Sequence, residues 1–154
     1  MEAYQVIERE EGIQASIWKQ LGKSGVFPSG SVPQAHPALL VISPEAARQK
    51  LALPRACRTV LLPGDAGALL DGMRTASVVS YGASPRDSLT ISSREGGRVW
   101  AALQRELVTV DGRVVERQEF PLLVPQKENT LSALAVAGAL LLLGMPPELL
   151  EITN

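Results

Sequence analysis

Three short segments rich in Val, Leu and Ile constrain the fold of this chain more than any other feature. They are Ala38–Ile42 (ALLVI), Arg58–Leu62 (RTVLL) and Ser77–Tyr81 (SVVSY). Apolar runs of this length are typical of strands that are covered on both faces, as in a parallel sheet. Aromatic residues make up only 4% of the 154 residues, so the core must be aliphatic. This composition favours a sheet packed between helices over an aromatic-rich barrel.

The segments between these strands carry helix signals. Ser43 is placed as an N-cap before Pro44 and predicts a helix that runs to about Leu53. Asp65 predicts the cap of a shorter helix that continues through Met73. Strands that alternate with helices in this way predict a parallel sheet with crossover connections.

Elements are also predicted before and after this central region. Upstream, the sequence predicts a first strand, an amphipathic helix and a Gly- and Pro-rich loop, at Ala3–Glu8, Gly12–Leu21 and Gly22–Pro37. Downstream, it predicts β-rich stretches, a long apolar helix and a final short helix, at Ser88–Ser93, Arg98–Val110, Arg113–Val124, Thr130–Leu143 and Pro147–Ile152. The Asp111-Gly112 pair predicts a hairpin turn. Together these elements predict one α/β domain over residues 1–154, a three-layer sandwich with a mostly parallel central sheet and an antiparallel β-hairpin excursion.

Charge and cysteine usage exclude several classes of function. The net charge is -1, and the 15 basic residues are spread along the chain, so we expect neither nucleic-acid nor membrane-surface binding. Cys57 is the single cysteine, which leaves no disulfide or thiolate metal cluster, and we predict no metal site or cofactor. The N-terminal residues do not resemble a signal peptide, and the apolar stretch Ala133–Met145 is too short to span a bilayer. We therefore expect a cytoplasmic protein.

The order of motifs in the later part of the chain resembles a known family. RTVLLPGDAGALL places Asp65 after a strand, SVVSYGASPRDSLTIS ends a strand at Tyr81-Gly82, and KENTLSALAVAGALLLLGMPPELL begins a helix near Asn129. This order is similar to that in the middle, ATP-binding domain of the Mur ligases. The resemblance implies that domain's fold, and it places Asn129 at the position of an asparagine that contacts the nucleotide base.

The chain departs from that family where ATP would bind. Glu128 and Ser132 replace the histidine and the second asparagine of the last motif. A Gly-rich phosphate loop would lie between the first strand and the first helix, but this segment reads Glu8–Gln14 (EREEGIQ), with no Lys or Thr/Ser and with carboxylates that would repel a triphosphate. Gly22-Lys23-Ser24 matches the end of a phosphate loop, but it follows a helix, so we interpret Gly22 as a C-cap.

A candidate ligand site is nevertheless predicted where the central strands end. Ligands of open parallel sheets bind at the carboxyl ends of the strands, most often where the topology switches. The polar and glycine residues predicted at this edge are Gly64, Asp65, Tyr81, Gly82, Ser84, Arg86, Asp87 and Asn129. No catalytic residue is predicted. His36 reads as a loop residue and Cys57 as a small buried apolar residue.

These features favour a non-catalytic relative of the Mur ligase middle domain that acts as a binding, scaffold or regulatory protein. The resemblance implies a setting in bacterial cell-wall or amide-ligase metabolism. The alternative is a subunit of an ATP-dependent ligase, or of an enzyme that binds a nucleotide or small metabolite, completed by a partner chain. A third hypothesis is a domain kept for self-association. A protein partner or a homo-oligomer is therefore the interaction to expect.

Overall fold

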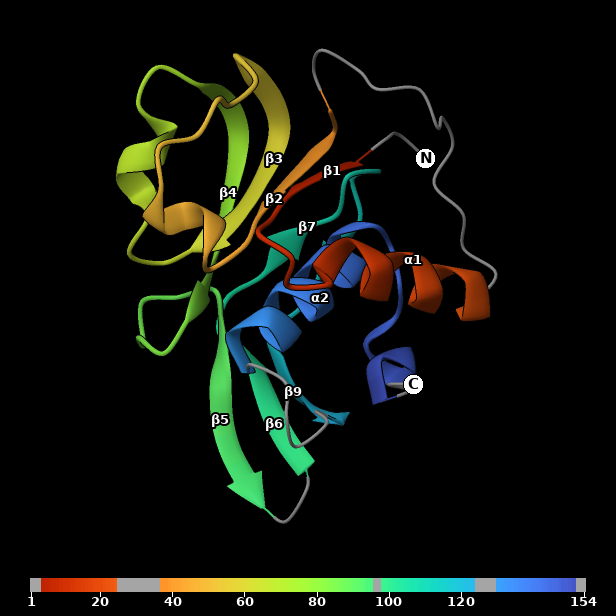
Figure 1. Cartoon of the computed structure of the whole chain (residues 1–154). Helices are drawn as coiled ribbons and strands as arrows, with labels where there is room; N and C mark the ends of the chain where they lie inside the picture. The colour runs from red at the N-terminus through yellow and green to blue at the C-terminus, as the bar shows by residue number, and fades with distance from the viewer. Residues whose placement is uncertain (1–3, 25–36, 96–97, 124–129, 152–154) are drawn as a thin grey trace.

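The structure is a computed structural model that describes residues 4–24, 37–95, 98–123 and 130–151. Seven strands form a mostly parallel sheet in the order β1-β2-β3-β4-β5-β6-β9, and β7 and β8 form a small antiparallel sheet (Figure 1). The strands are β1 (Tyr4–Ile7), β2 (Leu39–Ile42), β3 (Ala56–Pro63), β4 (Arg74–Gly82), β5 (Leu89–Glu95), β6 (Arg98–Leu103), β7 (Leu107–Val108), β8 (Val114–Val115) and β9 (Gln118–Leu123). The predicted strands and the parallel pairing of β1 to β4 are confirmed.

The two helices predicted between the central strands are wrong. Short 3-10 turns take their place, η1 (Ala46–Arg48) after β2 and η2 (Gly67–Leu70) after β3. Strands β3 and β4 begin at Ala56 and Arg74, just after the residues predicted to end each helix. The connecting segments instead pack leucine side chains against the smaller apolar cluster, namely Leu51, Leu53, Leu69 and Leu70.

Of the two predicted helix caps, Ser43 makes a capping hydrogen bond and Asp65 does not. The amide N–H of Ala46 donates to the Ser43 hydroxyl (3.0 Å), so Ser43 caps a turn even without a helix. No side chain caps η2, so the cap predicted for Asp65 is wrong.

The two α-helices cover one face of the sheet. These helices are α1 (Ile13–Ser24) and α2 (Thr130–Leu142), which pack against each other and against the larger core cluster. The other face carries η1, η2 and a smaller apolar cluster. Side chains of β3 alternate between these layers, Leu61 toward the helices and Leu62 away from them. The third layer of the predicted sandwich is thus made of 3-10 turns and connecting segments.

The apolar helix α2 is the centre of the core, as its sequence predicts. At Gly138 the helix approaches the sheet so closely that a Cβ would lie 3.0 Å from Leu61 Cδ2. The helix stops at Gly144, which has a φ of +103° that favours glycine. The first helix differs from its prediction. It continues through Gly22 to Ser24, so Gly22 is not its C-cap.

The antiparallel excursion forms an arm that runs away from the parallel strands (Figure 1). Strand β5 pairs with β4 only through Tyr81–Leu89 and Gly82–Thr90, and then pairs antiparallel with β6, which in turn pairs with β9. The predicted hairpin at Asp111-Gly112 is confirmed as the β7–β8 turn. The chain ends in η3 (Pro147–Glu151). Neither α1 nor α2 nor any other described helix has the length and apolarity to cross a membrane.

Candidate functional site

At the carboxyl edge of the sheet, the connections that follow β1 and β2 lead to opposite faces. The connection after β1 leads to α1 on one face, whereas the connection after β2 leads to η1 on the other. Ligands of parallel sheets often bind where neighbouring connections diverge in this way. The strand order itself does not reverse, so this divergence is the closest equivalent of a topological switch.

Glu8 lies at this point of divergence, directly after β1. Its two carboxylate oxygens accept hydrogen bonds from the amide N–H groups of Ile13 and Gln14, each at 2.9 Å. These are the first two residues of α1, and their N–H groups are the ones that would bind an anion at a helix N-terminus. The position that a phosphate would take is therefore filled by a carboxylate of the chain itself.

Glu11, in the same loop, makes hydrogen bonds within the loop and to the segment before η1. It accepts a hydrogen bond from the Arg9 amide (3.0 Å) and another from the Glu45 amide (3.2 Å) just before η1. The Arg9 guanidinium donates to the Gln49 side chain at 2.6 Å. Glu8 and Glu11 thus link the start of α1 to the segment just before η1.

A second group of predicted residues meets at the ends of β3 and β4. Asp87 is buried, and its carboxylate lies directly against the backbones of Gly64 and Gly82. A Cβ at Gly64 would lie 1.8 Å from Asp87 Oδ1, and a Cβ at Gly82 would lie 2.5 Å from Oδ2. At both positions, only glycine leaves room for the Asp87 carboxylate. The structure brings these three residues together, and the carboxylate fills the space between the two glycines.

The loop around Asp87 satisfies its own polar groups. The Ser84 amide donates to Asp87 Oδ2 (3.0 Å), and the Asp87 amide donates back to the Ser84 carbonyl (3.0 Å). Gln104 donates from Nε2 to the Asp87 carbonyl (2.7 Å). The sequence prediction missed Gln104, and no local signal marks it because it comes from the end of β6. Ser84 and Arg86 are exposed, and the Arg86 amide donates to the Ser84 hydroxyl.

Tyr81 and Asp65 point to different environments. The Tyr81 side chain is fully buried in the helix-covered core, and its hydroxyl donates to the Ile42 carbonyl at 2.7 Å. Burial, and then the charges of Glu11 and Asp65, raise the pKa of Tyr81. It is therefore a neutral structural residue. Asp65 is exposed, and Asn129 lies outside the described residues.

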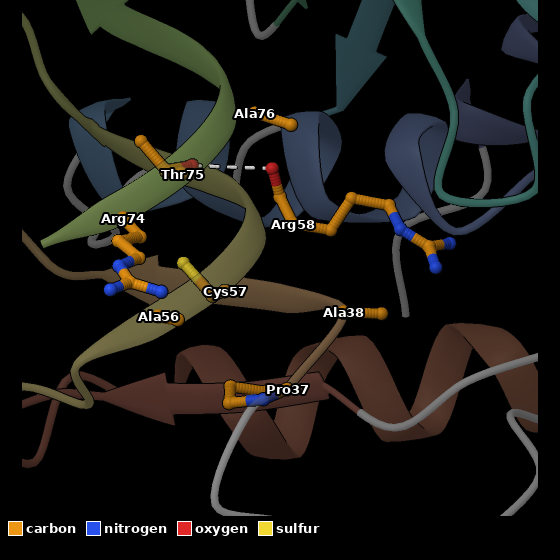
Figure 2. A pocket seen from close by; sticks show the side chains of 8 residues that line it. All are labelled: Pro37, Ala38, Ala56, Cys57, Arg58, Arg74, Thr75 and Ala76. Carbon is orange, nitrogen blue, oxygen red and sulfur yellow. Dashed lines mark hydrogen bonds between the residues drawn. The ribbon is translucent and has the colours of Figure 1, made fainter.

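A shallow cavity lies at the opposite, amino end of the parallel strands (Figure 2). Its volume is about 480 Å³, and it is lined by Pro37, Ala38, Ala56, Cys57, Arg58, Arg74, Thr75 and Ala76. The β3–β4 ladder is interrupted here, between the pairs Cys57–Thr75 and Thr59–Ser77. The Thr75 hydroxyl bridges the interruption, because it lies 3.2 Å from the Arg58 carbonyl and 3.1 Å from the Ser77 carbonyl.

The chemistry of this cavity is limited. Burial raises the pKa of the Cys57 thiol, although a hydrogen bond with Thr75 lowers it, and Cys57 Sγ contacts Met73 Sδ at 3.7 Å. A thiol held neutral is a poor nucleophile, so the prediction of Cys57 as a small buried residue is confirmed. In Figure 2 the guanidinium groups of Arg58 and Arg74 point away from each other, so they do not form one anion clamp. His36 lies outside the described residues.

Within the described ranges, no group of three or more His, Cys, Asp and Glu side chains is arranged to hold a metal ion. Comparison with protein-family models gives no match for this chain, and comparison with curated proteins gives none either.

Proposed function

We propose that this chain is a non-catalytic binding or scaffold domain, with the layout of a Mur ligase middle domain, that uses no nucleotide. One observation carries the proposal, namely the hydrogen bonds from Ile13 and Gln14 to the two oxygens of Glu8. A phosphate at this helix N-terminus would have to displace a covalently tethered carboxylate and would then be repelled by it. Bacterial cell-wall or amide-ligase metabolism is the setting that the sequence resemblance suggests, and the cytoplasm is the location that the N-terminal residues and the short apolar stretch predict.

The arrangement around Asp87 supports the same proposal. A ligand that approached the ends of β3 and β4 would meet a buried carboxylate that already fills the space beside Gly64 and Gly82. The alternative, an enzyme subunit completed by a partner chain, would need the partner to deliver a phosphate to the corner that Glu8 and Glu11 occupy. The geometry therefore favours a protein-binding role.

The test is thermal unfolding with and without ATP-magnesium, ADP and a uridine-sugar nucleotide. A ligand that binds only the folded state raises stability by about 2.7 kcal/mol at a hundred times its dissociation constant. We expect no shift of the midpoint with any of the three. A clear shift with ATP-magnesium would refute the proposal.

A variant sharpens this test. Glu8→Ala frees the amides of Ile13 and Gln14, so inorganic phosphate should raise the midpoint of this variant and not that of the wild type. The control is Glu106→Ala, which removes an exposed glutamate between β6 and β7. If phosphate stabilised the wild type and Glu8→Ala equally, the carboxylate would not be what keeps anions out.

A further inference from the structure

The cavity at the amino end of the parallel strands is lined mainly by small side chains. It lies where β2, β3 and β4 begin, and its volume is about 480 Å³. Pockets that bind ligands usually measure about 300–1,000 Å³, so this space is large enough for the side chains of two adjacent residues. Its apolar walls come from Pro37, Ala38, Ala56, Cys57 and Ala76 (Figure 2).

Arg74 gives the mouth of this cavity a positive charge. It is exposed and pairs with Ala56 in the β3–β4 ladder, and in Figure 2 its guanidinium lies beside Ala56 and Cys57. The exposed Arg55 is its neighbour, because the Arg74 amide donates to the Arg55 carbonyl at 2.9 Å. Among the described residues, no carboxylate forms an ion pair with Arg74, not even that of Asp71 three residues earlier. A carboxylate from outside the chain would therefore find this guanidinium available.

The second arginine of the cavity contacts the chain itself. The Arg58 guanidinium donates to the Val110 carbonyl at 2.7 Å, in the loop between β7 and β8. In Figure 2 it points away from Arg74. A single guanidinium therefore faces a ligand, and this suits one carboxylate better than a chain of phosphates.

Thr75 adds a hydrogen-bond acceptor to the lining. Its hydroxyl oxygen lies 3.2 Å from the Arg58 carbonyl oxygen and 3.1 Å from the Ser77 carbonyl oxygen. A hydroxyl donates its single hydrogen to one carbonyl at a time, and its oxygen keeps lone pairs that accept an N–H. Every residue of a peptide except proline carries a backbone N–H. The cavity thus complements an aliphatic side chain, a carboxylate and a peptide N–H.

We propose that this cavity binds a segment of a protein partner in which an aliphatic side chain stands next to an acidic residue. The aliphatic side chain lies against the small apolar residues, and the acidic side chain pairs with Arg74. The proposal rests on the binding function proposed above, because it names the chemistry of the partner and the place where it docks. That place is opposite the edge that the carboxylates of Glu8 and Asp87 occupy.

The shape and charge of the cavity favour a protein segment over a free metabolite. Sites for small molecules bury about 70–90% of their ligand, whereas this cavity is shallow and leaves one side of an occupant in solvent. A side chain that belongs to a larger partner needs less burial, because the rest of the partner adds contacts. The exposed Arg55 and Arg74 select an acidic segment over a basic one.

The first test is an NMR titration of the full chain with the hexapeptide Ac-Ser-Gly-Leu-Glu-Gly-Ser-NH2. We expect concentration-dependent shifts of the amides of Cys57, Thr75 and Ala76, and none at Ile13 and Gln14 at the other end of the sheet. Replacing Glu by Gln in the peptide should weaken binding about threefold, and replacing Leu by Gly about tenfold. The absence of shifts at the cavity, or equal binding of the three peptides, would overturn the proposal.

Charge reversal tests the role of Arg74. Arg74→Glu should reverse the preference, so that the same peptide with Lys in place of Glu binds more tightly than the acidic one. The control is Arg94→Glu, which reverses an exposed arginine on β5 and should keep the preference for the acidic peptide. Because two peptides are compared on one variant, a partial loss of stability affects both alike. An Arg74→Glu variant that still preferred the acidic peptide would contradict the proposed ion pair.

Filling the cavity tests its location. Ala76 is exposed, and Ala76→Phe should abolish the shifts at Cys57 and Thr75, whereas Ala15→Phe on the exposed side of α1 should leave them unchanged. Undiminished binding to Ala76→Phe would place the peptide elsewhere. N-acetylleucine, a free carboxylate with the same aliphatic group, should bind more weakly than the hexapeptide, and equal binding would assign the cavity to a metabolite instead. These outcomes are separate from the nucleotide test, because a chain that binds ATP at the carboxyl edge could still bind this peptide, and a chain that ignores nucleotides could fail to bind it.

Discussion

The carboxyl and amino ends of the parallel strands differ in how completely the chain fills them. At the carboxyl end, the carboxylates of Glu8, Glu11 and Asp87 take the positions where an anionic ligand would approach. At the amino end, the β3–β4 ladder is interrupted, and the Thr75 hydroxyl spans the interruption. A cavity remains beside it. The carboxyl edge is where ligands of parallel sheets usually bind, yet in this chain its own side chains occupy that edge. Substitutions should therefore cost more stability at the carboxyl end than at the amino end.

The largest effect is expected at Gly64. Gly64→Ala places a methyl group 1.8 Å from the present position of Asp87 Oδ1, so the buried carboxylate must move. We expect a loss of about 3 kcal/mol in the free energy of unfolding, measured by chemical denaturation.

Two variants check that this loss arises from the contact with Asp87. The double variant Gly64→Ala/Asp87→Ala should lose less unfolding free energy than the sum of the losses of the two single variants, because the clash is absent without the carboxylate. Gly67→Ala, where a Cβ would meet nothing within 4 Å, should change stability by less than about 0.5 kcal/mol. Strict additivity of the two changes would show that the carboxylate does not fill this space.

A smaller effect is expected for Tyr81→Phe, which removes the buried hydrogen bond to the Ile42 carbonyl. The loss should be about 1.5 kcal/mol at neutral pH. The variant should also change how the free energy of unfolding depends on pH in the alkaline range. The raised pKa of Tyr81 means that the unfolded chain, with an ordinary value of 10.0, ionises first.

The sign of the pH effect follows from this order of ionisation. The stabilisation is complete below pH 10 and is lost as the pH rises above it, because only the unfolded state releases the proton. Unfolding midpoints measured in denaturant across this pH range should fall less steeply for Tyr81→Phe than for the wild type. Parallel curves would indicate that Tyr81 ionises freely in the folded protein.

Loss of the helix cap should have a still smaller cost. Glu8→Ala removes both hydrogen bonds to the start of α1, and we expect a loss of about 1 kcal/mol. Hydrogen exchange should be faster for the amides of Ile13 and Gln14 and nearly unchanged in α2. An unchanged exchange rate at these amides would argue that water replaces the carboxylate at no cost.

The smallest effect is expected at the amino end. Thr75→Val removes the hydroxyl that bridges the interrupted ladder, but this region borders an open cavity where water can bond to the carbonyls of Arg58 and Ser77. We expect a loss of less than about 0.5 kcal/mol in denaturation. A loss as large as that of Gly64→Ala would abolish the contrast between the two ends.

Local sequence features predicted much of the candidate site and part of its geometry. The positions of Gly64, Gly82 and Asp87 follow from where strands end, because a short apolar run followed by a glycine fixes a strand end locally. The role of Tyr81 was not predictable, because which face a tyrosine takes at a strand end depends on register with its neighbours. Gln104 was missed for a similar reason, since its contact with Asp87 joins residues far apart in the chain.

The sequence by itself determined the central strands, the Asp111-Gly112 hairpin and the buried helix that ends at Gly144, because each depends on the properties of adjacent residues. Only the tertiary structure decided that 3-10 turns replace two helices, that carboxylates occupy the carboxyl edge and that the pairing of β4 with β5 runs through Tyr81 and Gly82. These outcomes depend on which distant neighbour satisfies each backbone group and fills each space, and that competition is settled only when the whole sheet is assembled.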